Sequence, residues 1–129
     1  MKYKNLLGID YGRSWIGIAV AESGLAEPLV VVENSKSLSR IDNFIDRYQI
    51  EAIVVGVSEG KMADETKIFA REIEMKFGLP VYFHDETLSS QDTRELIAKA
   101  GIKRNKRENK IDHYVAAMIL QDYIDSQNI

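Results

Sequence analysis

Acidic residues stand at three places in the sequence where predicted elements end or begin. Asp10 follows an apolar run, and Asp112 begins the amphipathic segment near the C-terminus. Asp85 and Glu86 end another short apolar run. In an open α/β sheet, ligands bind beyond the carboxyl ends of the parallel strands. We therefore expect carboxylates from these three places to converge at one end of a sheet.

Converging carboxylates repel one another and raise the pKa of at least one of them unless a cation compensates. Since the chain has no cysteine and only 2 histidines, oxygen donors favour Mg²⁺ or Mn²⁺ over zinc. With two such ions, one lowers the pKa of an attacking water and the other stabilises the leaving oxygen of a phosphodiester. Structural roles stay open: Asp10 could open a turn, Glu86 could form an ion pair, and Asp112 could cap a helix, where the helix dipole favours a carboxylate.

Basic residues gather directly before Asp112. The segment Lys103–Lys110 (KRNKRENK) holds five basic residues and one acidic residue, a local charge of +4. Since the net charge of the chain is −3, the rest of the chain carries a charge of −7. We expect a basic loop at the rim of the acidic site, where cations neutralise substrate phosphates. A solvated connection between helices is the alternative. The candidate phosphate contacts are Arg13, Lys61, Lys103, Arg104, Lys106, Arg107 and Lys110.

Composition limits the class of protein. With 129 residues, 45% of them hydrophobic and 29% charged, the chain is expected to form a single globular domain over residues 1–129. No apolar run approaches the ~20 residues of a membrane span, and the first ten residues do not resemble a secretory signal. The lack of cysteine fits a reducing compartment. We expect a cytoplasmic protein without a membrane partner.

The order of predicted elements indicates an α/β fold. Three strands come first, then strands and helices alternate. The predicted strands are Tyr3–Asp10, Trp15–Val20, Pro28–Glu33, Glu51–Val57 and Val81–His84. The predicted helices are Ser37–Tyr48, Asp64–Phe77, one from Ser89 or Ser90 to Ala100, and Ile111–Ser126. This order predicts a five-stranded mixed sheet with helices on both faces.

Four segments resemble one known family. They are GIDYGRSWIGIAV, IVVGV, GLPVYFHDETLSS and KIDHYVAAMILQDYI, in this order along nearly the whole chain. They resemble the YqgF family, whose members are described as Holliday junction resolvases or pre-16S rRNA nucleases with a ribonuclease H-like fold. The resemblance implies that Asp10, Glu86 and Asp112 form a catalytic, metal-binding triad. It further implies a nuclease acting on structured RNA or branched DNA, as a monomer or a homodimer.

The sequence also departs from the family pattern. Thr87 stands where the family usually has a basic residue, and the loop after Val57 is shorter than is typical. Arg13 is the one basic residue after the first D-Y-G, where many members have two. Val115 occupies a position where related nucleases often have a further acid. These differences alter the rim of the expected site.

Three functions are therefore compared. The first is a metal-dependent nuclease for ribosomal RNA precursors, with junction resolution as its DNA counterpart. The second is an ATP-binding protein of the actin and sugar-kinase type, since D-Y-G-R-S resembles that phosphate loop; those proteins need two lobes, and 129 residues provide one. The third is a nucleic-acid-binding or ribosome-assembly factor that keeps the fold without catalysis.

Overall fold

The computed structural model describes residues 2–57, 60–85 and 104–127, with the side chains of Lys61 and of residues 104–112 outside the description. The predicted helix from Ser89 or Ser90 to Ala100 lies outside the described residues. The strands are β1 (Asn5–Asp10), β2 (Trp15–Glu22), β3 (Leu25–Glu33), β4 (Ala52–Val57) and β5 (Val81–Asp85). The helices are the short 3₁₀ helix η1 (Asn34–Lys36), α1 (Ser37–Tyr48), α2 (Lys61–Phe77) and α4 (Arg104–Gln127).

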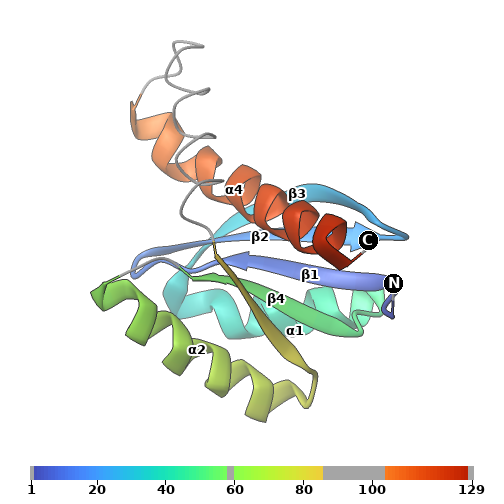
Figure 1. Ribbon diagram of the computed structural model, residues 1–129. Coiled ribbons are helices and arrows are strands. Elements are labelled where there is room, and N and C mark those ends of the chain that lie inside the picture. Colours follow the sequence, from blue (N-terminus) through green and yellow to red (C-terminus); the bar gives the residue numbers. More distant parts are fainter. Residues whose placement is uncertain (1, 58–59, 86–103, 128–129) are drawn as a thin grey trace.

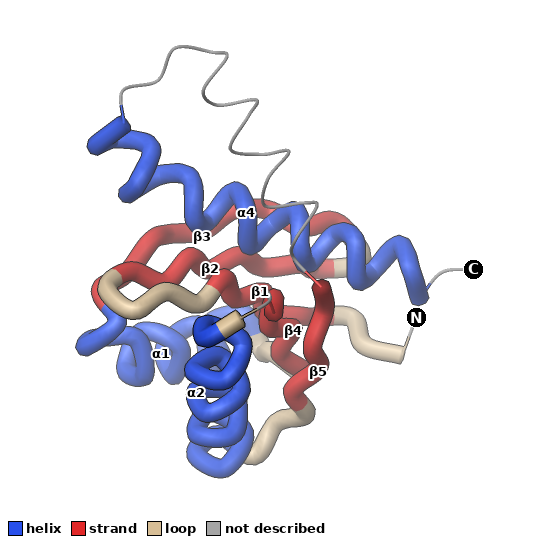
Figure 2. Tube along the Cα trace, turned by 60° about the vertical axis from the view of Figure 1, so that its left-hand side comes forward, coloured by secondary structure: helices blue, strands red, loops and turns tan. Residues whose placement is uncertain are grey.

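The strands form one mixed sheet in the order β3-β2-β1-β4-β5. β2 pairs antiparallel with both β1 and β3, whereas β4 pairs parallel with β1 and β5. Helices α1 and α2 cover one face of this sheet and α4 crosses the other (Figures 1 and 2). The predicted five-stranded mixed sheet with helices on both faces is confirmed.

Each face of the sheet has its own hydrophobic core. Leu7, Ile9 and Ile53 pack with α1 and α2 on one side. Leu6, Val54 and the buried stripe of α4 pack on the other. Strands β1 and β4 carry near-continuous apolar runs because both faces are covered.

The hairpin of β2 and β3 is attached to helix α4. Its turn residues Ser23 and Gly24 both have positive φ, 64° and 95°, as two-residue hairpin turns commonly require. The side-chain amide of Gln121 donates to the carbonyl of Gly24 and accepts from the backbone N–H of Ala26. These bonds place the C-terminal half of α4 beside the hairpin turn, so α4 runs antiparallel to β1.

The start of the last helix differs from the prediction. Helix α4 begins at Arg104, so Arg104, Lys106, Arg107 and Lys110 belong to its first two turns and not to a loop. The segment has no glycine or proline, and lysine, arginine and glutamate favour helices. Asp112 is consequently in the third turn, so the predicted stabilisation by the helix N-terminus is wrong. Helix α2 also begins early, at Lys61 instead of Asp64.

Candidate active site

Asp10 is the last residue of β1, the central strand of the sheet. It is 5% exposed and lies between Gly17 of β2 and Gly56 of β4 in the strand register. Neither neighbour across the sheet has a side chain that could fill the space beside the carboxylate. Ligands of open α/β sheets bind beyond the carboxyl ends of the parallel strands. The position of Asp10 at the end of β1 therefore suits ligand binding.

The loop after Asp10 is fixed by tight backbone packing. A Cβ at Gly12 would come within 2.3 Å of the carbonyl oxygen of Trp15, so only glycine fits there. Asn34 donates from its side-chain amide to the carbonyl of Gly12 at 2.8 Å. These contacts hold the chain beyond β1 in one course, close to the end of Asp10's strand.

Asp10 faces helix α4. Side chains alternate along a strand, and Leu6 packs in the α4 core while Leu7 and Ile9 pack in the core of the opposite face. Gly8 shares the α4 face, because a Cβ there would lie 2.9 Å from the Cβ of Leu120. By the same alternation Asp10 lies on the α4 face.

Helix α4 brings position 112 to the end of β1. A Cβ at Gly8 would lie 3.0 Å from the carbonyl of Ala116, so strand and helix nearly touch at this level. Four residues back along α4 from Ala116 is about 6 Å, and two residues forward along β1 is about 7 Å. Because the two elements are antiparallel, both steps lead in the same direction, to Asp112 and Asp10. Position 112 also precedes the buried Val115 and Ala116 by three and four residues, which is about one helical turn.

The close approach at Gly8 gives a first prediction. Gly8→Ala is expected to destabilise the protein by about 1–3 kcal/mol, because the added methyl group overpacks a filled space against the backbone of α4. The free energy of unfolding in urea measures this. Gly78→Asn is the control: its space is open and its φ is 68°, a conformation that asparagine accepts. Equal small effects for the two variants would contradict the tight contact between β1 and α4.

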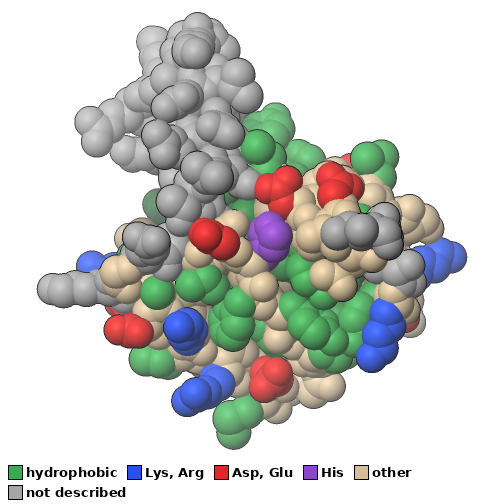
Figure 3. Space-filling view, in the orientation of Figure 1, with side chains coloured by type: hydrophobic (Ala, Val, Ile, Leu, Met, Phe, Trp, Pro, Cys, Tyr) green, Lys and Arg blue, Asp and Glu red, His purple; other side chains and the backbone are tan. Residues whose placement is uncertain are grey.

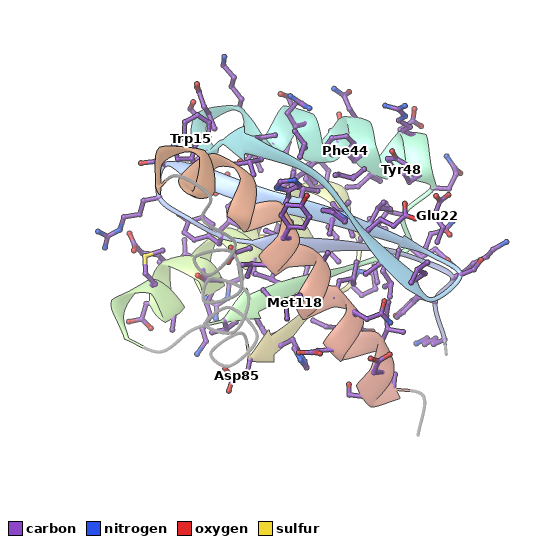
Figure 4. The ribbon with its side chains drawn as sticks, turned by 90° about the horizontal axis from the view of Figure 1, so that it is seen from above. Trp15, Glu22, Phe44, Tyr48, Asp85 and Met118 are labelled. Carbon is purple, nitrogen blue, oxygen red and sulfur yellow. The ribbon has the colours of Figure 1, made fainter. Side chains whose placement is uncertain are left out.

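Asp85, the last residue of β5, lies on the opposite face of the sheet from Asp10. Val81 packs in the core on the α2 side, whereas the ring of His84 contacts Tyr123 of α4. Asp85 therefore shares the α2 face with Val81 and Phe83 by strand alternation, opposite to the face of Asp10. Figure 4 shows Asp85 at the end of β5. Glu86, the predicted triad member, lies outside the described residues.

The predicted cations are placed unevenly. Arg13, in the loop after β1, binds Glu65 of α2, with its Nε 2.8 Å from Oε2 and 3.1 Å from Oε1. Lys61 is the first residue of α2, and Lys103 lies outside the described residues. In the views of Figures 1 and 2 the start of α4, with the remaining four cations, extends beyond the sheet. The ion pair of Arg13 was missed because its partner is 52 residues away.

This ion pair gives a second prediction. Its side chains are 63% and 37% exposed, and such pairs are worth about 0–1 kcal/mol. Glu65→Gln is therefore expected to release Arg13 for phosphates and to tighten binding of structured nucleic acid about two- to fivefold at low salt. Fluorescence anisotropy measures the dissociation constant. Glu72→Gln, an exposed acid on the same helix, removes equal charge, and an equal gain there would refute a specific role for Glu65.

Four tyrosines pack against the two hydrophobic cores. Tyr11 lies 4.9 Å from Phe69, ring centre to ring centre, and packs against the core. Tyr82, Tyr3 and Tyr123 cluster between β5 and α4. The hydroxyls of Tyr3 and Tyr82 share a 2.7 Å hydrogen bond, which with burial and the two nearby phenols raises the pKa of Tyr82 to about 12. Tyr3, Tyr82 and Tyr123 pack the sheet against α4, whereas Tyr11 packs on the α2 side.

The side chains of two of the three predicted metal ligands, Glu86 and Asp112, lie outside the described part of the structure. Among the side chains that the structure describes, no three His, Asp or Glu residues gather as a metal site; the side chains of Glu86 and Asp112 are not in that set. Val115 is fully buried and packs in the α4 core, so this departure from related nucleases supplies packing in place of a fourth acid.

Within residues 2–57, 60–85 and 104–127, no helix is long and apolar enough to cross a membrane.

Comparison with known proteins supplies the family. Residues 4–126 match the model of the RuvX family, described as "Holliday junction resolvase". The chain belongs to this family. Relatives in it named "Putative pre-16S rRNA nuclease" include those of Methylobacillus flagellatus, 36% identical over 93% of this chain and 90% of the relative, and Listeria monocytogenes, 31% identical over 95% and 99%. The predicted family, named YqgF above, is confirmed.

Solved structures agree on the fold. The chain is similar to Thermus thermophilus RuvC in complex with a Holliday junction substrate, with a TM-score of 0.61 and 19% identity over 97% of this chain and 96% of that one. A second Thermus thermophilus RuvC structure gives a TM-score of 0.53. The ribonuclease H-like fold predicted from the sequence is confirmed.

Proposed function

We propose that this protein is a metal-dependent nuclease that hydrolyses phosphodiester bonds of structured nucleic acid, with precursor 16S ribosomal RNA as its substrate. The observation that carries the proposal is the buried Asp10 at the end of the central strand, at the level where α4 brings position 112. Membership of the RuvX family supports it. A single ribonuclease H-like domain over residues 1–129 is the proposed unit of activity.

The donor set fits a hard divalent cation. Asp10 supplies a carboxylate in a buried, glycine-flanked position, and the chain lacks thiolates. We propose that Asp10, Glu86 and Asp112 hold Mg²⁺ or Mn²⁺. When bound, such an ion activates water and stabilises the charge that develops on the leaving oxygen.

The remaining residues of the proposed site bind and orient the substrate. The cations at the start of α4 and at Arg13 and Lys61 neutralise backbone phosphates. These contacts position a duplex or a branch without specifying its sequence. Since α4 is one continuous helix from Arg104, phosphate binding at its start is coupled mechanically to the position of Asp112.

RNA is favoured over DNA by the names of the relatives. Two observations keep a Holliday junction resolvase as a second candidate: the description of the matching family and the fold shared with RuvC along nearly the whole chain. Junction resolution cuts two strands, so a resolvase is expected to act as a homodimer with one site for each strand. An enzyme that processes RNA can act as a monomer. A catalytically weak ribosome-assembly factor is a further alternative. Thr87 supports it, because the family usually has a basic residue at this position and threonine carries no charge.

The experiment compares substrates under one set of conditions. The purified protein is incubated with a 5′-extended 16S RNA precursor and with a four-way DNA junction, in Mg²⁺, Mn²⁺ or a chelator. We expect metal-dependent cleavage of the RNA and none with the chelator. Cleavage of the junction alone would establish the resolvase. Salt-sensitive binding without any cleavage would overturn the nuclease proposal and support the assembly factor.

A further inference from the structure

A groove lies on the face of the sheet opposite to Asp10. It has a volume of about 190 Å³ and opens between helix α2 and the edge strand β5. We call it the α2–β5 groove. Its lining residues are Lys67, Ala70, Arg71, Glu74, Val81 and Phe83.

The floor of the α2–β5 groove is aromatic and exposed. Phe83 is 48% exposed although it stands in a strand of the sheet. It shares the α2 face with Val81, which packs against the core, while the alternate residues Tyr82 and His84 contact Tyr123 of α4. About half of the Phe83 surface is thus exposed, and an exposed aromatic ring suits stacking with a nucleobase.

Two cations line the same groove. Lys67 and Arg71 are one helical turn apart on α2, so both side chains lie on one side of the helix. Both are exposed, and neither forms an ion pair with another residue in the described part of the chain. Glu74 is the one carboxylate among the lining residues. In Figure 3, Lys and Arg side chains lie beside hydrophobic ones over α2.

The groove is next to the proposed site along the chain. Phe83 precedes the end of β5 by two residues, and the proposed metal ligand Glu86 directly follows that end. Strand β5 is the edge strand in the described sheet, so the groove lies at the margin of that sheet.

We propose that the α2–β5 groove binds the single-stranded segment that flanks the cleavage site of the substrate. A base stacks on Phe83, and Lys67 and Arg71 contact the phosphates on either side of it. An aromatic surface beside a pair of cations is the combination that single strands require. This inference rests on the proposed nuclease function and extends it, since it names which part of the substrate lies outside the catalytic centre.

The test measures binding without catalysis. Labelled homopolymers of U or of dT, about ten nucleotides long, are titrated into the full chain in a chelator, which removes the metal site from the measurement. Lys67→Gln with Arg71→Gln is expected to weaken binding about tenfold and to lower the salt slope by about 1.4, since each single-strand contact contributes roughly 0.7. Phe83→Ala is expected to weaken binding about tenfold. Phe83→Leu keeps the apolar packing but removes the aromatic ring, and it is expected to weaken binding as much as Phe83→Ala does.

The matched control replaces two exposed cations outside the groove, Arg47→Gln with Lys76→Gln, and we expect it to change the affinity less than twofold. Amide NMR shifts at Ala70 and Phe83 on addition of the oligonucleotide locate the site. No binding by the wild type at low salt, or equal losses for groove and control variants, would overturn the inference. A preference for U over dT, or the reverse, identifies the nucleic acid. Cleavage of structured substrates is a separate readout, so failure of the nuclease proposal is recognised independently.

Discussion

Replacing Asp10 with asparagine is expected to lower the cleavage rate at least about a hundredfold, since an electrostatic or metal contribution to the transition state is worth several kcal/mol and 1.36 kcal/mol is tenfold. The substitution keeps the size of a side chain that is 5% exposed, so the fold is expected to persist. Single-turnover cleavage at saturating protein separates this loss from an effect on binding.

Asp85→Asn is the control that makes this prediction specific. Asp85 is adjacent to Glu86 in the chain but shares the sheet face of Val81 and Phe83, away from Asp10. We expect its variant to retain the cleavage rate within about threefold, the usual range for a surface substitution. If Asp85→Asn were as damaging as Asp10→Asn, the assignment of Glu86 to the site would be wrong.

Neutralising Lys103 and the three cations in the first turn of α4 is expected to have the second largest effect. The variant carries Lys103→Gln, Arg104→Gln, Lys106→Gln and Arg107→Gln. Removing four phosphate contacts lowers the salt slope of duplex binding by up to about 3.6, since each contact contributes roughly 0.9. We expect the affinity for structured nucleic acid to fall at least about a hundredfold at low salt.

Helix α4 is expected to survive this change, because glutamine is nearly as good a helix former as lysine and arginine. Circular dichroism checks the helix content, and anisotropy against salt concentration gives the slope. Four exposed cations elsewhere, at Lys36, Arg40, Arg47 and Lys76, are changed to glutamine as a charge-matched control. An unchanged slope in the α4 variant would rule out phosphate binding there.

The position of Asp10 at the end of a strand is predicted correctly from the sequence because its signal is local. A continuous apolar run that ends in a carboxylate indicates a buried strand and its exit, and Asp10 is the last residue of β1. The chain order of strands and helices likewise predicts the mixed sheet, since parallel strands need crossover connections.

The basic segment shows where local signals mislead. A run of like charges is typical of solvated loops, yet Arg104–Lys110 lacks any residue that breaks a helix, and the helix continues through it. Because of this, Asp112 is positioned by the contact of Gly8 with Ala116 and Leu120, a tertiary feature that the pattern does not encode. The pairing of Arg13 with Glu65 and the groove at Phe83 likewise depend on elements that are distant in the chain.

Binding of Mn²⁺ to the protein alone tests the central claim most directly, because it needs no substrate. Isothermal titration calorimetry compares the wild type with Asp10→Asn and with Asp42→Asn, a control at an exposed position on α1. We predict saturable binding by the wild type and the control, and an affinity at least about tenfold lower for Asp10→Asn, since removing one charged donor costs more than 1.4 kcal/mol. Equal affinities for all three proteins would contradict a metal site at the end of β1.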